Sequence, residues 1–175
     1  MITISIIVAV SENNVIGKDN KLIWHMPADM KFFKEKTTGH CVITGRKNYE
    51  SIPEKFRPLP NRTNIIVTRQ TEYKAPGAIV VDSIEEAIKK AKETGDTEIF
   101  IIGGAEIFKQ TIDKINKIYL TKINHSFEGD TFFPEIDLTQ WLEIRREDFL
   151  PDEKNKYPYS FIQYINPTYA VEGEE

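Results

Sequence analysis

Short runs of apolar residues alternate along this chain with segments in which apolar residues recur at helical spacing. The apolar runs predict strands at residues 2–10, 41–44, 64–68, 79–81, 99–102 and 118–123. The helical segments predict helices at residues 27–37, 47–52, 84–94 and 105–112. Several apolar runs are almost continuous, which indicates central parallel strands covered on both faces. The alternation as a whole is typical of an α/β fold.

The pattern changes after Phe127. Residues 141–149 and 157–165 read as strands, and the loop of sequence Pro-Asp-Glu-Lys-Asn-Lys between them leaves no room for a helix. They predict an antiparallel hairpin that closes one edge of the sheet. We therefore expect a single mixed, mainly parallel central sheet flanked by about four helices, all within one domain at residues 1–166. Residues 167–175 are expected to form a flexible acidic tail.

Composition narrows the class of protein. A chain of 175 residues suits one domain. Its composition, 40% hydrophobic and 29% charged, excludes a disordered, collagen-like or coiled-coil chain. The chain carries 23 Lys and Arg against 27 Asp and Glu, a net charge of −4. That balance excludes the basic surface of a dedicated nucleic-acid binder.

Cys41 is the single cysteine, so neither an intramolecular disulfide nor a multi-cysteine metal site can form. Because it lies in an apolar run, we interpret it as a buried strand thiol rather than a nucleophile. No metal is expected, since His25, His40 and His125 lack the spacing of metal ligands. The apolar N-terminal stretch is too short to cross a bilayer and has no cleavage site. A reducing, cytoplasmic setting is therefore expected.

Asp29 is the first candidate for chemistry. Pro27 suits the start of the predicted helix, which places Asp29 in its first turn and Phe33 on the same face. A carboxylate on an apolar face must find donors or stay protonated, and a cleft binding a ligand with N–H groups would supply them. Burial would raise its pKa and the helix dipole would lower it, so the sequence leaves its ionisation open. A solvated first-turn acid remains the alternative.

Gly103 and Gly104 connect an apolar strand directly to a helix. Glycine lets a ligand approach the backbone closely, and a helix N-terminus offers free N–H groups to phosphate. The third glycine of the dinucleotide fingerprint is absent. The segment is therefore either a phosphate site or a tight structural turn.

Cations also follow the ends of predicted strands. Arg46 and Lys47 come after one strand, and Thr68 and Arg69 come after the next. Open α/β sheets bind ligands at this edge, so these residues suit a phosphorylated cofactor; scattered surface charge is the alternative. Arg62 ends a proline-rich connection, where it is either a bidentate clamp for a carboxylate or a solvated side chain.

Taken together, these segments resemble dihydrofolate reductase over nearly the whole chain. The matching motifs, in the order and spacing of the family, are VIG (15–17), WHMPAD (24–29), GR (45–46) with YESI (49–52), RPLPNR (57–62) with NII (64–66), IGGAEIF (102–108), YLT (119–121) and EGDTFFP (128–134). Each motif is modest by itself, but the ordered set is highly specific.

The resemblance implies hydride transfer from NADPH to 7,8-dihydrofolate, giving 5,6,7,8-tetrahydrofolate with protonation at N5. It implies that Asp29 hydrogen-bonds the pterin and promotes that protonation, that Thr121 supports the carboxylate, and that Trp24 helps to hold an ordered water. Arg62 would grip the α-carboxylate of the glutamate tail. The other positions that match the folate cleft are Ile7, Val8, Met30, Phe33, Ile52, Leu59 and Ile102.

On the cofactor side, the resemblance implies a long set of contacts. The matching positions are Ala9, Ile16, Gly17, Leu22, Gly45, Arg46, Lys47, Asn48, Thr68, Arg69, Gly103, Gly104, Ala105, Glu106, Ile107 and Phe108. Residues 17–22 resemble a mobile lid over the nicotinamide, and residues 128–130 the loop that packs against it. The Gly103–Gly104 peptide is expected to be cis, and Gly104→Ala is expected to lose stability and cofactor affinity together.

Two positions depart from the family pattern. Ile23 stands where a proline commonly precedes the tryptophan, which leaves the stiffness of the lid open. Glu106 stands where some members have a cation, so any pyrophosphate contact there would be made by the backbone. The expected partners are dihydrofolate and antifolates, with no nucleic acid, no membrane and a monomeric chain.

Two other functions remain open on the sequence. One is a reductase of the same fold that uses NADPH on a pyrimidine intermediate of flavin synthesis. The pairing of Asp29 with Phe33, together with Arg62, argues against it, because these are folate-side features. The other is a non-catalytic nucleotide-binding module, which would give the face that carries Asp29 no role.

Overall fold

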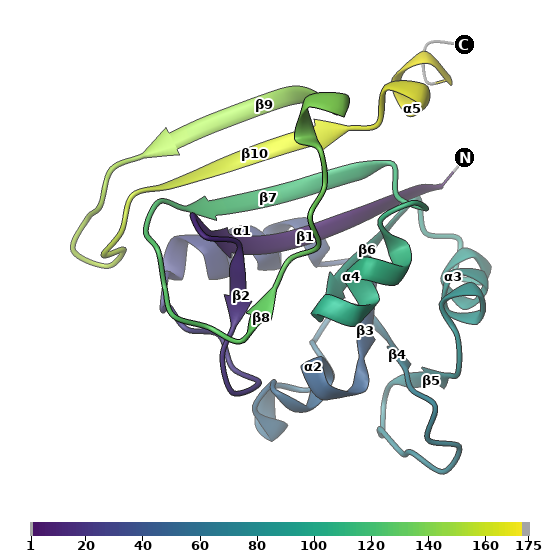
Figure 1. Ribbon diagram of the computed structural model, residues 1–175. Coiled ribbons are helices and arrows are strands. Elements are labelled where there is room, and N and C mark those ends of the chain that lie inside the picture. The colour runs from purple at the N-terminus through teal and green to yellow at the C-terminus, as the bar shows by residue number, and fades with distance from the viewer. Residues whose placement is uncertain (1, 173–175) are drawn as a thin grey trace.

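The computed structural model describes residues 2–172, and an eight-stranded sheet runs through them in the order β5-β4-β3-β6-β1-β7-β10-β9 (Figure 1). The strands are β1 Thr3–Ser11, β3 Cys41–Gly45, β4 Thr63–Val67, β5 Ile79–Val81, β6 Glu98–Gly103, β7 Lys117–Ile123, β9 Leu142–Phe149 and β10 Tyr159–Ile165. Strand β10 runs antiparallel to β7 and β9, and the other pairs are parallel. The predicted mixed sheet with a C-terminal hairpin is confirmed.

Helices cover both faces of this sheet. The helices packed there are α1 Pro27–Thr37, α3 Ile84–Glu93 and α4 Ala105–Thr111; α2 Arg46–Glu50 and α5 Pro167–Glu172 are two further helices. Apolar residues of α3 and α4 pack with one face of the sheet in the largest core cluster. Phe32 and Phe33 of α1 pack on the other face against Phe100 and Tyr119. Because both faces are buried, the central strands are apolar almost throughout.

Some elements were not predicted from the sequence. Strands β2 (Val15–Gly17) and β8 (Thr131–Phe132) pair in a small second sheet beside the main one. Helix α5 occupies the first part of the segment that the sequence assigns to an acidic tail, and residues 173–175 of that tail lie outside the described residues. The two strands of the small sheet are too short to produce a periodic pattern, so only their tertiary pairing identifies them.

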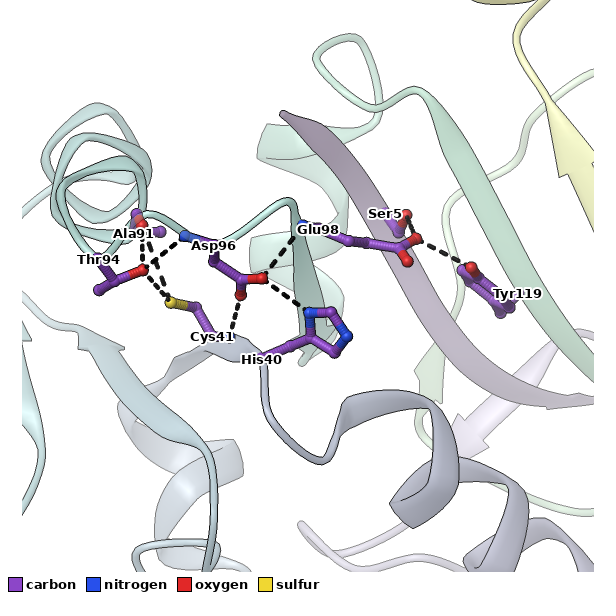
Figure 2. Close-up of polar contacts among 8 residues, drawn as sticks. All are labelled: Ser5, His40, Cys41, Ala91, Thr94, Asp96, Glu98 and Tyr119. Carbon is purple, nitrogen blue, oxygen red and sulfur yellow. Dashed lines mark hydrogen bonds and ion pairs between the residues drawn. The ribbon is translucent and has the colours of Figure 1, made fainter. Parts of the chain in front are cut away.

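Cys41 lies at the edge of the sheet where β3 and β6 begin (Figure 2). Its Sγ atom is 3.3 Å from Thr94 Oγ1 and is buried. The carboxylate of Asp96 accepts hydrogen bonds from the backbone N–H of Cys41 at 2.7 Å and pairs with His40 Nδ1 at 2.8 Å. Burial raises the pKa of the Cys41 thiol, which disfavours the nucleophilic thiolate. The cysteine is a structural thiol, as its apolar run predicts.

Candidate active site

Two adjoining cavities open at the carboxyl ends of the parallel strands, the edge where α/β sheets bind ligands. The larger cavity has a volume of about 730 Å³ and lies between β1, α1 and the end of β6. The smaller has a volume of about 540 Å³ and lies between the β2 loop, α2 and α4. Four residues line both cavities, namely Ile16, Leu22, Asn48 and Gly104. Ligands in the two cavities would therefore meet at these residues.

The walls of the larger cavity are apolar and partly open to solvent. Leu22, Met30 and Phe56 each keep more than half of their surface exposed, at 53%, 54% and 55%, and all three line this cavity. Apolar surface gathered around a cavity and left uncovered marks a ligand site rather than a core. All eight residues expected to bind the substrate line this cavity, namely Ile7, Val8, Met30, Phe33, Ile52, Leu59, Arg62 and Ile102.

Asp29 lies in the first turn of α1 and is the acid that faces the larger cavity. Burial raises the pKa of its carboxyl from 3.8 to about 6. A hydrogen bond from the buried hydroxyl of Thr121 acts in the opposite direction. Thr121 is on β7, where it pairs with Ala9 of β1, so the sheet holds the hydroxyl beneath the helix. A carboxyl with a pKa close to neutral is suited to acid–base work near physiological pH.

Trp24 lies just before α1, with 5% of its surface exposed. Its ring packs on Phe127 at a centroid distance of 5.3 Å. Among the described residues, no acceptor lies within hydrogen-bond distance of its buried Nε1–H. A buried donor without an acceptor is costly, so this N–H is suited to a bound water or ligand atom. Neither Trp24 nor Thr121 lines the larger cavity directly.

Arg62 stands at the mouth of the larger cavity, held in place by neutral acceptors. Its Nε donates to the carbonyl of Pro60 at 2.9 Å, and one terminal nitrogen donates to Thr37 Oγ1 at 3.1 Å. Its guanidinium also lies over the ring of Phe33, 6.0 Å from the centroid. Partial burial lowers the pKa of Arg62. The group is oriented but its charge is not neutralised by these partners, which suits recognition of an anion.

The diglycine segment joins β6 to α4, and the Gly103–Gly104 peptide is cis, as expected. The side chain of Asn48 donates to Thr44 Oγ1 at 2.9 Å, and Thr44 Oγ1 donates to the carbonyl of Gly103 at 3.1 Å. A Cβ on Gly104 would meet no protein atom within 4 Å, whereas one on Gly103 would lie 3.0 Å from the ring of Phe108. The structure therefore gives no steric reason for Gly104→Ala to destabilise the fold, and the crowded glycine is Gly103.

Most of the residues expected to bind the cofactor line the smaller cavity. They are Ile16, Gly17, Leu22, Gly45, Arg46, Lys47, Asn48, Gly104, Ala105, Glu106 and Ile107. Ala9 and Phe108 line the larger cavity instead. Gly103, Thr68 and Arg69 line neither cavity.

Thr68 and Arg69 nevertheless follow the strand next to the one that leads to Arg46. Gly45 at the end of β3 pairs with Val67 at the end of β4, so Arg46 and Thr68 continue from neighbouring positions. Arg46 also forms an ion pair with Glu50 at 3.0 Å, which leaves part of its charge neutralised within α2. Arg69 is exposed and comes directly after Thr68, so it adds a further cation near this edge of the sheet, outside the smaller cavity.

The loop over the smaller cavity is tied down at several points. The backbone N–H of Asp130 donates to the carbonyl of Gly17 at 3.1 Å, and the N–H of Asp19 donates to the Asp130 carboxylate at 2.9 Å. Across the cavity, the side chain of Asn20 donates to the carbonyl of Lys47 at 3.1 Å. The two segments that resemble a lid and its supporting loop are therefore in contact.

The sequence interpretation missed several lining residues. In the larger cavity they are Lys34, Pro53, Phe56 and Pro60. In the smaller cavity they are Ser51 and Thr131, while Asn20 and Lys21 belong to the expected lid at residues 17–22. Lys34 follows Met30 by four positions on α1 and adds a second cation to the lining of this cavity, which helical spacing from Met30 could have indicated. The residues of loops carried no such periodic signal.

Within residues 2–172, no cluster of three or more His, Cys, Asp or Glu side chains is placed to hold a metal ion. Among the helices of that range, none has the length and apolar character needed to cross a membrane.

The comparisons with known proteins agree with this geometry. A family model described as dihydrofolate reductase matches residues 3–166. The dihydrofolate reductase of Haemophilus influenzae is 47% identical over 161 residues, which cover 91% of this chain and 96% of that protein. The dihydrofolate reductase of Bacillus subtilis is 44% identical over 161 residues, which cover 92% and 93%. Among solved structures, dihydrofolate reductase from Enterococcus faecalis complexed with NADP(H) and RAB-propyl matches with a TM-score of 0.87 and 41% identity, covering 94% of this chain and 96% of that chain. This chain belongs to the dihydrofolate reductase family.

Proposed function

We propose that the two cavities divide the reaction of the family between them, with dihydrofolate in the larger and NADPH in the smaller. As a member of the family, the chain is an NADPH-dependent oxidoreductase that reduces 7,8-dihydrofolate to 5,6,7,8-tetrahydrofolate. The observation that carries the assignment of the cavities is the Asp29 carboxyl, with its pKa near 6, inside an apolar cavity that adjoins a cationic one. The rival assignments, a reductase of flavin synthesis and a non-catalytic module, are not supported.

The residues of the smaller cavity fit a phosphorylated nicotinamide cofactor. Arg46, Lys47 and Lys21 bring positive charge to it, and the open side of Gly104 gives access to the backbone. When bound, NADPH supplies the hydride, and the chain supplies binding, orientation and electrostatics. We propose that Ile16, Leu22, Asn48 and Gly104 enclose the point where hydride passes between the cavities.

In the larger cavity, we propose that the Asp29 carboxyl hydrogen-bonds the pterin amino group and N3 and promotes protonation at N5. Thr121 would hold the carboxyl in place through its hydroxyl, and Trp24 Nε1 would donate to a water beside the pterin. Backbone carbonyls of Ile7 and Ile102 would accept from the amino group. Burial supports this division of roles, because it strengthens each of these contacts.

Arg62 is proposed to bind the α-carboxylate of the substrate tail, with Lys34 as a second cation near the cavity mouth. We expect Arg62→Ala to raise KM for dihydrofolate roughly tenfold to a hundredfold with little change in kcat, because a charge-assisted hydrogen bond contributes about 1.5–3 kcal/mol. Steady-state kinetics check this. A dihydropterin without the glutamate tail is the control, and it should be reduced equally by variant and parent. A variant that loses kcat on both substrates would contradict the assignment.

Arg69, with Thr68 and Arg46, is proposed to meet the 2′-phosphate that distinguishes NADPH from NADH. We expect Arg69→Ala to weaken NADPH binding by roughly tenfold or more while barely changing NADH binding. Fluorescence titration with each cofactor measures this. Arg145→Ala, which removes an exposed cation from β9, should change neither affinity. Equal losses for NADPH and NADH would exclude a 2′-phosphate contact by Arg69.

The overall reaction is tested by mixing the protein with NADPH and following the loss of its absorbance. NADPH should be oxidised only after dihydrofolate is added, with no metal or flavin, and a chelator should have no effect. Antifolates are proposed to compete with dihydrofolate for the larger cavity. We further propose a monomer in a reducing, cytoplasmic setting, which the free, buried thiol of Cys41 supports.

A further inference from the structure

The loop between β9 and β10 reaches back to the start of α1, the helix that carries Asp29. The Oδ1 atom of Asn155 accepts a hydrogen bond from the backbone N–H of Ala28 at 3.0 Å, across 127 positions of sequence. Asn155 is 5% exposed, so this contact is made inside the protein. A loop residue therefore caps a helix that it does not belong to.

Helix α1 has no side-chain cap of its own. Met26 occupies the N-cap position without a side-chain hydrogen bond, and Pro27 at the first helical position has no N–H to satisfy. The N–H of Asp29 bonds to the carbonyl of Met26 at 3.0 Å. Within the first turn of α1, the N–H of Ala28 is therefore the donor that an outside acceptor must satisfy.

The loop is built to hold Asn155 in this place. The carboxylate of Asp152 accepts from the backbone N–H groups of Lys154 and Asn155, at 2.9 and 2.7 Å. The amide nitrogen of Asn155 donates to the same carboxylate at 3.1 and 3.2 Å, which fixes the orientation of the amide. Asn155 therefore presents its oxygen, and not its nitrogen, to the helix.

Aromatic packing fixes the loop against the segment before α1. Tyr157 packs on Phe127 at a centroid distance of 5.1 Å, and Phe127 packs on Trp24 at 5.3 Å. Tyr157 and Ala28 both pack against the buried cluster that contains Trp24 and Met26. The contact between Asn155 and Ala28 is thus part of a packed interface rather than an isolated surface bond.

The hydrogen bond from Ala28 to Asn155 lies directly beside Asp29. Asp29 is the third residue of α1, directly after Ala28, and a carboxylate in the first turn of a helix is attracted to free N–H groups there. We propose that Asn155 is a positioning residue for Asp29. Asn155 accepts the hydrogen bond of the Ala28 N–H, so the Asp29 carboxylate stays directed at the pterin and does not cap its own helix. This inference rests on the role proposed for Asp29.

The elements packed around Asp29 bring three charged side chains into the argument, on α1, before β4 and on the β9–β10 loop. Lys34, on the same helix as Asp29, and Arg62, just before β4, line the same cavity as Asp29. On the β9–β10 loop, Asp152 is the charge directly hydrogen-bonded to Asn155. The residues of β1 and β7 that face Asp29, among them Thr121, are uncharged. The loop is therefore the place where a charge can be moved toward Asp29 without altering the cavity.

Two variants separate positioning from simple stability. Asn155→Ala frees the Ala28 N–H, and capture of that donor by the Asp29 carboxylate should lower the pKa of Asp29. The double variant Asp152→Asn/Asn155→Asp exchanges the two side chains. It can keep the cap on Ala28, the two backbone bonds of the loop and one bond between the exchanged side chains, and it leaves the net charge unchanged. It moves the negative charge from Asp152 to the position that contacts α1, which should raise the pKa of Asp29. Each shift is expected to be roughly 0.5–1 pH unit.

The measurements are single-turnover hydride transfer over a series of pH values and, without ligands, a carbon NMR titration of the Asp29 carboxyl. The signal is assigned by its loss in Asp29→Asn. Asn116→Ala is the matched control, because it removes a comparable side-chain bond, to the N–H of Ile4 at 2.8 Å, remote from both cavities. It should lower the melting temperature and leave the titration unchanged.

Opposite shifts of the Asp29 titration in the two variants support the proposal. Equal titrations in parent and variants, or shifts in one direction only, would overturn it, however far the melting temperature falls. If Asn155→Ala does not fold, Asn155→Ser takes its place in the comparison, because its shorter side chain withdraws the acceptor from the Ala28 N–H. A parent pH profile that survives in Asp29→Asn would instead refute the proposed role of Asp29, and the NMR titration would still test Asn155.

Discussion

Replacing Asp29 by asparagine is expected to slow hydride transfer at neutral pH by roughly a hundredfold to ten-thousandfold, the usual contribution of a positioned acid or base. Asparagine keeps the shape of the side chain and part of its hydrogen bonding but cannot exchange the proton. Single-turnover rates with bound NADPH and dihydrofolate measure the effect. Acidic buffer should partly restore the rate, because solvent can then protonate the substrate. A variant that transfers hydride at the parent rate would remove Asp29 from the mechanism.

The parent enzyme should lose hydride transfer as the pH rises through about 6, because the raised pKa of Asp29 keeps its carboxyl protonated only below that value. The midpoint near pH 6 should disappear in Asp29→Asn, whose rate should rise only in more acidic buffer, as solvent protonates the substrate.

The same substitution should stabilise the protein without ligands. Burial raises the pKa of Asp29 from 3.8 to about 6, so the folded state binds the proton more tightly than the unfolded state. The contribution of Asp29 to stability is then complete below pH 3.8 and is lost as the pH rises through about 6. At neutral pH, Asp29→Asn should raise the free energy of unfolding by about 1–3 kcal/mol, toward the lower end because the carboxyl faces an open cavity. Thermal melts measure this, and Asp113→Asn at an exposed site should change nothing.

The second large effect is expected at the diglycine segment, where two adjacent alanine substitutions should have different consequences. Gly103 has a φ of +116°, and a Cβ there would lie 3.0 Å from two ring carbons of Phe108. The ring of Phe108 is buried and packs edge-on against Phe133, at 5.2 Å, so it has little room to move. Gly103→Ala should therefore lower the free energy of unfolding by about 2–4 kcal/mol, as backbone strain and overpacking add.

Gly104→Ala should leave the melting temperature close to that of the parent, because no described residue beyond its chain neighbours lies within 4 Å of the added Cβ. Gly104 lines both cavities, so the added methyl group would occupy space meant for ligands. We expect it to weaken NADPH and NADH equally, by roughly tenfold, since the clash does not involve the 2′-phosphate. A thermal melt and a cofactor titration on each variant check both expectations. Equal melting temperatures for Gly103→Ala and Gly104→Ala would contradict the expected difference in stability.

Local sequence determined the eight strands of the main sheet, helices α1 to α4, and the edge of the sheet at which the site lies. Apolar runs identify the strands because burial on both faces removes polar residues from them. Helix starts were also readable: Ser83 and Glu86 match the capping pattern, and the Ser83 hydroxyl accepts from the N–H of Glu86 at 3.1 Å. Parallel strands end at a common edge. Arg46 directly follows β3 and Gly103 ends β6, so the two residues belong to one region.

The resemblance to a family added what local patterns could not. The eight residues expected in the substrate cleft come from separate segments, and all of them line one cavity. No periodicity relates Ile7 to Leu59, since spacing within one element says nothing about which distant element lies opposite it. The ordered motifs supplied that information, because a fold shared with relatives also shares its long-range contacts.

Only the tertiary structure decided how each group in the site behaves. The ionisation of Asp29 depends on the depth of the cavity and on Thr121, which lies on another element. The choice between Gly103 and Gly104 depends on where the ring of Phe108 packs. The cap on α1 depends on Asn155, from a loop at the far end of the chain. In each case the deciding contact joins residues remote in sequence, and such contacts are set by packing rather than by local propensity.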